Sequence, residues 1–402
     1  MIGLAYCDRG GRIYFDASRE PIADAGVLRE VSRDDVIPAP PGTVEMILPG
    51  RRVRTTRGAE RSRYALAAIL PAGYTRTLVP AYTSEPDAPA LPLFGYTFAC
   101  VVDDELHVAA VKTDESEDWQ PRYFEPGALE AMLDRRLATD PGNQVLAQVA
   151  LCSREYGCFT AQNVFLERGE AALPVSPKCN ARCVGCISEQ EPESGLVSPQ
   201  LRIAYETSAD ELARIGIHHL ERVEDGIVSF GQGCEGEPLL RSIAIAGAIE
   251  RIRAQRANGT INLNTNGSMP QALERCIDAG LQAVRVSLNS FRPHAYAAYY
   301  RPIGYGLDDV LASIRLAVAR GLRVSLNLLT HPGVTDDEEE IAAMNEFLSE
   351  VRVRMIQTRT LNIDPQWYFD AVGRPERPLG MRHAIESIRA HHVAVGNFTH
   401  TH

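Results

Sequence analysis

Three cysteines stand close together in the segment PKCNARCVGC, residues 177–186, with the spacing C-x₃-C-x₂-C. They are Cys179, Cys183 and Cys186. Thiolates bind soft metal centres, but a closed zinc site or an ordinary iron–sulfur cluster takes four protein ligands. Three cysteines on a [4Fe–4S] cluster leave one iron open to a ligand that is not protein. The spacing therefore predicts such a cluster, with a zinc site completed by a fourth residue elsewhere as the alternative.

The composition is that of a globular enzyme. The chain has 402 residues, of which 45% are hydrophobic and 23% charged, and its formal net charge is −11. The negative charge argues against broad nucleic-acid binding. No apolar stretch is long enough to span a membrane, and the N-terminal residues do not resemble a signal peptide. An odd number of unevenly spaced cysteines, nine in all, argues against a disulfide framework. We therefore expect a cytoplasmic protein without a membrane partner.

The elements that must position the cysteines begin near residue 170. Before that point, short β-prone runs alternate with Pro- and Gly-rich loops, and one helix is expected at 126–138. After it, strand and helix patterns alternate, and residues 306–320 form the clearest amphipathic helix. The expected strands are AALPV (171–175), GIVSF (226–230), TINLNTN (260–266), AVRVSLN (283–289), RVSLNLLT (323–330) and RVRMIQTRT (352–360).

Alternating strands and helices predict parallel βα units, whose ligand sites lie at the carboxyl ends of the strands. Six units are fewer than the eight of a complete barrel. The predicted fold class is therefore α/β, a partial (β/α)₆ TIM-like barrel of parallel strands with an N-terminal mostly-β domain. We divide the chain into a β domain of unassigned role (1–150), a connector with Cys152 and Cys158 (151–170), a core (171–360), and a C-terminal helix and tail (361–402).

Two further patterns concern the environment of the expected site. Lys178 and Arg182 flank the cysteines, and we expect their charges to favour thiolates. The string RVSLN occurs at 285–289 and again at 323–327. This repeat predicts that Asn289 and Asn327 occupy the same place near the carboxyl ends of two strands, facing a ligand.

The cysteine motif after the first strand of a six-fold βα series resembles the radical S-adenosylmethionine (SAM) superfamily. FGQGCEGEPLL, residues 230–240, is similar to the glycine-rich GGE-type motif of that family, and LNTNG, residues 263–267, is similar to its TNG segment. The resemblance covers roughly residues 171–360. It implies a [4Fe–4S] cluster held by the three cysteines, with SAM bound to the open iron. The cofactor-binding residues that it implies are Gly236, Glu237, Thr265, Asn266, Ser287, Asn289 and Asn327.

The sequence also departs from the family pattern. The residue before the third cysteine is commonly aromatic in the family, whereas here it is Gly185. Cys234 and Glu235 form an additional pair within the glycine-rich motif. No cobalamin-binding DxHxxG pattern is present, which argues against a cobalamin-dependent methyltransferase. No cysteine follows Cys276, and this argues against the C-terminal cluster extension of many peptide-modifying members.

Several residues remain outside these motifs. Cys152, Cys158 and Cys234 suggest a second metal site or a substrate-facing thiol, but C-x₅-C is a weak spacing and we interpret them as buried cysteines. The segment SFRPHAYAAYYRP (290–302) and the strand before it supply our first candidates for substrate contact, which are Arg285, Arg292, Tyr299, Tyr300 and Arg301.

The resemblance implies an oxygen-sensitive enzyme that reductively cleaves SAM to a 5′-deoxyadenosyl radical. This radical would abstract hydrogen from an unidentified substrate such as a peptide or protein. An electron donor such as flavodoxin or ferredoxin is the implied partner, and nucleic acid is not expected. The alternatives are a glycyl-radical-type activase and a non-enzymatic metalloprotein holding zinc or an electron-transfer cluster.

Overall fold

The computed structural model describes residues 2–114, 126–255 and 258–397. Its first part is an antiparallel β unit built on an eight-stranded sheet, in which β10, β6, β7, β1, β11, β12 and β5 are successive neighbours and β2 pairs with β1. The hairpin between β11 and β12 turns through Asp103 and Asp104, both with positive φ. The strands are β1 (Ile2–Cys7), β2 (Ile13–Asp16), β3 (Ile22–Asp24), β4 (Leu28–Glu30), β5 (Ile37–Pro38), β6 (Val44–Thr55), β7 (Gly58–Ile69), β8 (Tyr74–Arg76), β9 (Val79–Pro80), β10 (Tyr82–Ser84), β11 (Thr97–Val102), β12 (Glu105–Val108) and β13 (Ala110–Lys112).

The second part is a seven-stranded parallel sheet whose strands follow one another in chain order. The six expected strands are present, and a short seventh strand, β20, extends the sheet beyond them. Among the strands of the described ranges, β14 and β20 are the two edges and do not pair with each other, so the barrel is partial. The strands are β14 (Glu170–Leu173), β15 (Ile227–Phe230), β16 (Thr260–Thr265), β17 (Ala283–Leu288), β18 (Arg323–Thr330), β19 (Met355–Thr360) and β20 (Ala394–Gly396).

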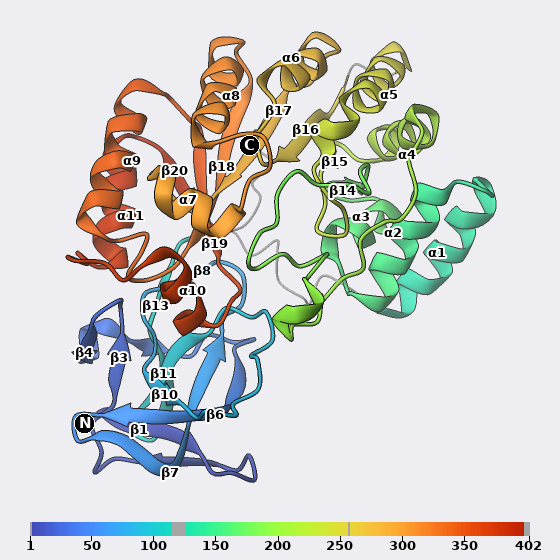
Figure 1. Cartoon of the computed structure of the whole chain (residues 1–402). Coiled ribbons are helices and arrows are strands. Elements are labelled where there is room, and N and C mark those ends of the chain that lie inside the picture. The colour runs from blue at the N-terminus through green and yellow to red at the C-terminus, as the bar shows by residue number, and fades with distance from the viewer. Residues whose placement is uncertain (1, 115–125, 256–257, 398–402) are drawn as a thin grey trace.

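Helices cover the outer face of this sheet (Figure 1). Alternate residues of the strands, such as Val284, Val286 and Leu288 of β17, are fully buried in the main hydrophobic cluster that includes residues of the helices. The helices of this part are α4 (Ala209–Arg222), α5 (Ser242–Gln255), α6 (Pro270–Asp278), α7 (Pro293–Tyr300), α8 (Leu307–Ala319), α9 (Glu338–Glu350), α10 (Pro365–Val372) and α11 (Met381–Ala390). No helix of the described ranges combines the length and apolar character needed to cross a bilayer.

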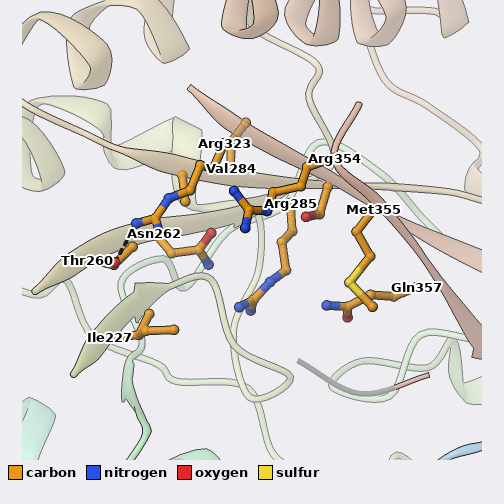
Figure 2. A pocket seen from close by; sticks show the side chains of 11 residues that line it. Ile227, Thr260, Asn262, Val284, Arg285, Arg323, Arg354, Met355 and Gln357 are labelled. Carbon is orange, nitrogen blue, oxygen red and sulfur yellow. Dashed lines mark hydrogen bonds between the residues drawn. The ribbon is translucent and has the colours of Figure 1, made fainter. Parts of the chain in front are cut away.

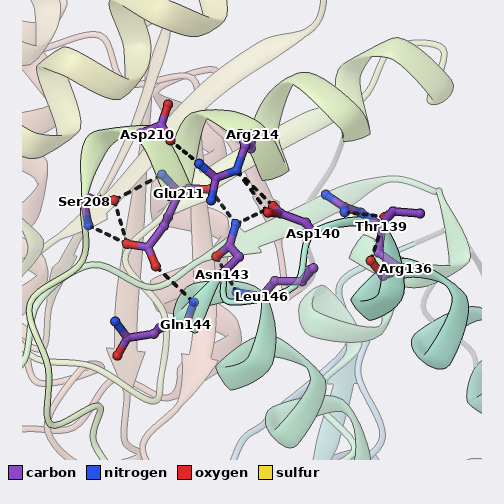
Figure 3. A network of polar contacts seen from close by, with 10 residues as sticks. All are labelled: Arg136, Thr139, Asp140, Asn143, Gln144, Leu146, Ser208, Asp210, Glu211 and Arg214. Carbon is purple, nitrogen blue, oxygen red and sulfur yellow. Dashed lines mark hydrogen bonds and ion pairs between the residues drawn. The ribbon is translucent and has the colours of Figure 1, made fainter.

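Three helices, rather than one helix and a connector, precede the parallel sheet. They are α1 (Pro126–Thr139), α2 (Gln144–Glu155) and α3 (Phe159–Leu166), and they lie beside β14 and α4 in Figure 1. Figure 3 shows the polar network that joins α1, α2 and the turn between them to α4. Buried Asn143 caps α2 by accepting from the Leu146 N–H at 3.0 Å and donates to the Glu211 carbonyl at 3.2 Å. Arg214 donates to Asp140 at 3.1 Å. The region that carries Cys152 and Cys158 is therefore part of the folded helical layer.

The N-terminal β unit packs against the carboxyl end of β19 and the segment that follows it, as Figure 1 shows. Fully buried Arg76 donates to the carbonyls of Tyr96, at 3.0 Å, and Leu361, at 2.8 Å. Arg51 forms a buried ion pair with Asp364, with 2.8 Å between Nη2 and Oδ2. Because a buried charge needs its partner, these contacts fix the position of the β unit on the barrel.

Candidate functional site

The three motif cysteines lie on the loop that follows β14, at the carboxyl edge of the parallel sheet. Cys179, Cys183 and Cys186 are half-buried and line one cavity of about 570 Å³. Arg202, Arg301 and Trp367 are among the other residues that line it. The cysteine loop therefore occupies the edge where parallel α/β folds bind their ligands.

The last residues of α7 form backbone hydrogen bonds with the cysteine loop. The Val184 N–H donates to the Tyr299 carbonyl at 3.0 Å, and the Arg182 N–H donates to the Tyr300 carbonyl at 3.1 Å. Both tyrosines are almost fully buried. Their expected role as substrate contacts is therefore wrong, since burial and these backbone bonds make them supports of the cysteine loop.

The glycine before the third cysteine has a structural explanation. A Cβ at Gly185 would lie 3.0 Å from the Tyr299 hydroxyl oxygen and 3.2 Å from the Asn362 carbonyl oxygen. Both are tight contacts with well-packed groups. A side chain at this position would require Tyr299 or the Asn362 carbonyl to shift by a few tenths of an ångström.

Burial dominates the electrostatics of the thiols. It raises the pKa of Cys179 to about 11 and that of Cys183 well above its ordinary value. Our expectation that Lys178 and Arg182 favour thiolates is not met, since both are exposed and burial outweighs any effect of their charges. The guanidinium that reaches a thiol is Arg202, whose Nη2 lies 3.6 Å from the Cys186 sulfur.

The glycine-rich motif packs directly against the cysteine loop. The Gly236 N–H donates to the Ser176 carbonyl at 2.7 Å, and the Glu237 N–H donates to the Lys178 carbonyl at 2.9 Å. A Cβ at Gly236 would lie only 2.0 Å from the Lys178 carbonyl oxygen. Glycine is therefore required here for close approach of the two loops.

The Glu237 carboxylate joins the glycine-rich motif to the TNG segment. It accepts from the Thr265 hydroxyl at 2.5 Å, from the Asn266 N–H at 2.8 Å and from the Leu239 N–H at 3.0 Å. The Asn266 side chain donates in turn to Asn180, in the cysteine loop, at 2.9 Å. The structure thus brings Gly236, Glu237, Thr265 and Asn266 together beside the cysteines, and direct contact of the Glu237 carboxylate with a cofactor stays a prediction.

Glu235 is a site residue that the sequence reading did not assign. Its fully buried carboxylate accepts from the N–H groups of Val175, Ser176 and Gln232 at 2.7 to 2.8 Å. Burial raises its pKa to about 8 despite these donors. This side chain fixes the chain leaving β14 to the chain leaving β15. The additional Cys234–Glu235 pair within the glycine-rich motif was the signal for it.

The inner face of the sheet is polar near its carboxyl half. Ser287, Asn327 and Gln357 are paired across β17, β18 and β19. The Asn327 Oδ1 and Gln357 Oε1 atoms are buried and have no hydrogen-bond partner among the described residues. Unpaired buried acceptors are costly, and they fit a ligand that offers hydroxyl or amino donors. Gln357 also lines the small cavity nearer the amino ends of the strands.

The expectation that Asn289 and Asn327 occupy equivalent places is wrong. Arg285 pairs with Ser325, so the two RVSLN copies are displaced by two residues relative to each other. Asn289 lies beyond the end of β17, where its amide donates to the Ala295 carbonyl and the Tyr368 hydroxyl, each at 3.0 Å. It is fully buried and holds α7 against α10.

Two of the arginines expected at the mouth also have other roles. Arg285 lines a small cavity near the amino ends of the strands (Figure 2) and forms a buried ion pair with Glu170 at 2.6 Å. Arg292 forms ion pairs with Asp337 and Glu340 at 2.9 and 3.1 Å. Of the three arginines, Arg301 is the one that lines the cysteine cavity.

Comparisons with known proteins agree with this geometry. Residues 173–344 match the model of the radical SAM superfamily. The chain is 32% identical over 188 residues to the GTP 3′,8-cyclase of Hydrogenovibrio crunogenus, covering 46% of this chain and 53% of that protein. It is 31% identical over 189 residues to the GTP 3′,8-cyclase of Thermodesulfovibrio yellowstonii, covering 46% and 54%. The chain therefore spans about half the length of these curated relatives.

Among solved structures, a radical SAM methyltransferase from Sphaerobacter thermophilus aligns with a TM-score of 0.39 and 16% identity, over 56% of this chain and 64% of that one.

Proposed function

We propose that the protein is a radical SAM enzyme that reductively cleaves SAM at a [4Fe–4S] cluster, because residues 173–344 match the model of the radical SAM superfamily. The observation that carries the proposal is the placement of Cys179, Cys183 and Cys186 in one cavity at the carboxyl edge of the sheet. The glycine-rich motif packs against the same loop.

The donor set fits such a cluster better than a single metal ion. Three soft thiols come from one short loop and line an open cavity. A structural zinc site needs four protein ligands in tetrahedral geometry. The cysteine loop therefore favours a cluster with one iron free for SAM.

Residues on neighbouring strands would hold SAM beside the cysteine loop. We assign donor recognition to the unpaired Asn327 Oδ1 atom, with Ser287 beside Asn327 on β17. The packed backbone at Gly236 and the Glu237–Thr265 pair form the adjoining wall. Because these groups belong to strand ends and well-bonded loops, they are positioned before the ligand binds.

A [4Fe–4S] cluster held by Cys179, Cys183 and Cys186 would supply the electron for reductive cleavage of SAM to methionine and a 5′-deoxyadenosyl radical, which would take hydrogen from a substrate. This chain's residues orient SAM and limit access of water. We assign the electron to an external donor such as flavodoxin or ferredoxin.

For the substrate we propose a peptide or protein. The unpaired edges β14 and β20 leave one side of the barrel unclosed by strands, which suits a macromolecular substrate. A nucleotide is the second candidate, because the curated relatives of the domain are GTP 3′,8-cyclases. Addition of GTP to the reduced enzyme should consume GTP only if the second candidate is right.

The test is anaerobic reconstitution with iron and sulfide, followed by dithionite and SAM. We expect 5′-deoxyadenosine and methionine in equal amounts, and neither from the Cys183→Ala variant. A reconstituted [4Fe–4S] protein that binds SAM without cleaving it, with each of several reductants, would contradict the proposal. The electron-transfer or structural-metal alternative would then be favoured.

A further inference from the structure

A second cavity lies where the N-terminal β unit meets the part of the chain that carries the parallel sheet. Its volume is about 280 Å³. The residues that line it come from the segments 25–35 and 77–78 of the β unit and from Asp336 and the segment 378–383 of the second part. The described residues that line this cavity are all different from those that line the cysteine cavity. A ligand bound here would therefore contact both parts of the molecule outside the cysteine site.

Two polar side chains that line the cavity have oxygen atoms without a partner. Asp336 is fully buried, and its Oδ1 atom accepts from the Gly333 N–H at 2.5 Å. The Asp336 Oδ2 atom and the Thr77 Oγ1 atom are also buried, and neither forms a hydrogen bond with any residue that the structure describes. An unpaired buried acceptor is costly. The two atoms, one from each part of the molecule, therefore fit a ligand that offers hydrogen-bond donors, and the carboxylate favours a cationic one.

A binding position for an anionic group lies next to these oxygens. The Leu379 N–H donates to the Asp336 carbonyl at 2.8 Å, two residues before α11 begins. The first N–H groups of a helix have no intrahelical partner, and no described side chain caps α11. Arg382, in the first turn, also lines the cavity, whereas Arg29 is already paired with Asp35 at 2.8 Å. The start of α11 therefore favours a carboxylate beside the position of a cation.

The remaining lining of the cavity is largely apolar. Ala25, Leu78 and Met381 are buried residues of this lining, and Val27 and Leu379 are exposed on it. Apolar side chains lose contact with water when an apolar group of a ligand covers them. The cavity therefore combines acceptors for a cation, donors for an anion and an apolar surface.

We propose that this cavity binds an α-amino acid with an apolar side chain. The ammonium group donates to Asp336 Oδ2 and Thr77 Oγ1, and the carboxylate lies at the start of α11 beside Arg382. The side chain packs against Leu78 and Met381. An α-amino acid carries its two charges on neighbouring atoms, as the adjacent acceptors and donors require, whereas a metal ion or a simple anion would match only one of them.

Isothermal titration calorimetry of the reconstituted full-length protein with L-leucine tests the proposal. Burial raises the pKa of Asp336 to about 7, so a titration at about pH 8 is made with the carboxylate ionised. We expect one site per chain with a dissociation constant below about 1 mM. Isoamylamine lacks the carboxylate and 4-methylpentanoate lacks the amino group. Each should bind at least about tenfold more weakly, because one charged group is left unmatched.

Variants locate the site. Asp336→Asn should weaken binding of L-leucine at least about tenfold, and Thr77→Val should weaken it about 3- to 10-fold through the loss of one hydrogen bond. Thr56→Val, at an exposed position of the β unit, is the matched control and should bind as wild type does. Cys183→Ala should also bind L-leucine normally, because the proposed site is separate from the cysteine cavity.

Three results would overturn the proposal. One is the absence of L-leucine binding to wild-type protein, and another is binding of isoamylamine as tight as that of L-leucine. The third is loss of binding in Cys183→Ala, which would place L-leucine at the cysteine site. The comparison of ligands uses wild-type protein, so it decides the question even if Asp336→Asn fails to fold. Because binding is measured directly, the result is independent of whether SAM is cleaved.

Discussion

Asn327 is one of several asparagines whose side-chain oxygen is buried without a partner among the described residues, as Asn289 is. Its Oδ1 atom is buried without a partner among the described residues, which costs free energy until a donor arrives. We expect Asn327→Leu to weaken SAM binding about 5- to 30-fold, the equivalent of one lost hydrogen bond of about 1 to 2 kcal/mol. The free energy of unfolding should not fall, because the unpaired amide is removed. Equilibrium binding and urea denaturation measure the two effects.

Ser325→Ala is the matched control, because Ser325 lies two residues earlier on the same face of β18 and lines the cavity near the amino ends of the strands. Its SAM affinity should equal that of wild type. Equal weakening by both substitutions would show that Asn327 acts only through general packing.

The buried Glu235 carboxyl group makes the stability of the folded protein depend on pH. Burial raises its pKa to about 8, so between about pH 4.5 and 8 the folded protein holds a proton that the unfolded chain has released. The contribution of Glu235 to stability is therefore full below about pH 4.5 and is lost as pH rises through 8, by up to about 1.4 kcal/mol per pH unit. We expect Glu235→Gln, which loses one backbone hydrogen bond, to be less stable than wild type at pH 5, with a deficit that shrinks towards pH 8.

Urea denaturation of the cluster-free protein at several pH values measures this difference. Glu346→Gln, at an exposed position of α9, is the control and should show a difference from wild type that does not change with pH. A deficit for Glu235→Gln that grows with pH would mean that its carboxylate is charged in the folded state.

At the scale of elements, the parallel strands followed from their apolar runs because one face of each strand packs under helices. The inner face could not be read in the same way. Arg285 was interpreted as a substrate contact, yet it lies inside the barrel against Glu170. The repeat of RVSLN could not predict the pairing register of β17 and β18, because that register depends on where each strand begins. β20 was missed because three residues are too few to show a period.

We expect the single and the double variant of the Arg285–Glu170 ion pair to differ strongly in their free energy of unfolding. Arg285→Met should destabilise the fold by about 3 to 5 kcal/mol, because it removes one member of a buried ion pair. The double variant Arg285→Met/Glu170→Leu should recover much of that loss, since both members of the ion pair are removed. Chemical denaturation gives both values. Equal loss in the single and double variants would place the stabilising role elsewhere in the network.

At the scale of the whole molecule, the segment after β19 contacts both the N-terminal β unit and the cysteine cavity. Asp364 pairs with Arg51 of the β unit, caps α10 by accepting from the Gln366 N–H at 3.0 Å, and accepts from the Tyr82 hydroxyl. Three residues later, Trp367 lines the cysteine cavity. The docking of the β unit and the shape of the cavity are therefore linked, which no local sequence pattern could indicate.

Asp364→Asn should destabilise the protein by about 3 to 5 kcal/mol, because Arg51 is left buried without a charged partner. It should also change the fluorescence of Trp367 in the folded protein. Asp370→Asn, at an exposed position of the same helix, should alter stability by less than about 0.5 kcal/mol. Unchanged stability in Asp364→Asn would show that the β unit docks without this ion pair.

The central claim is that the three cysteines hold a cluster whose remaining iron binds SAM. The most direct test is electron paramagnetic resonance of the reconstituted, reduced protein with SAM labelled with ¹⁷O in its carboxylate or ¹⁵N in its amino group. We predict about four irons per chain and a hyperfine coupling between the cluster and the labelled group. A four-iron cluster whose spectrum is the same with and without labelled SAM would contradict the account.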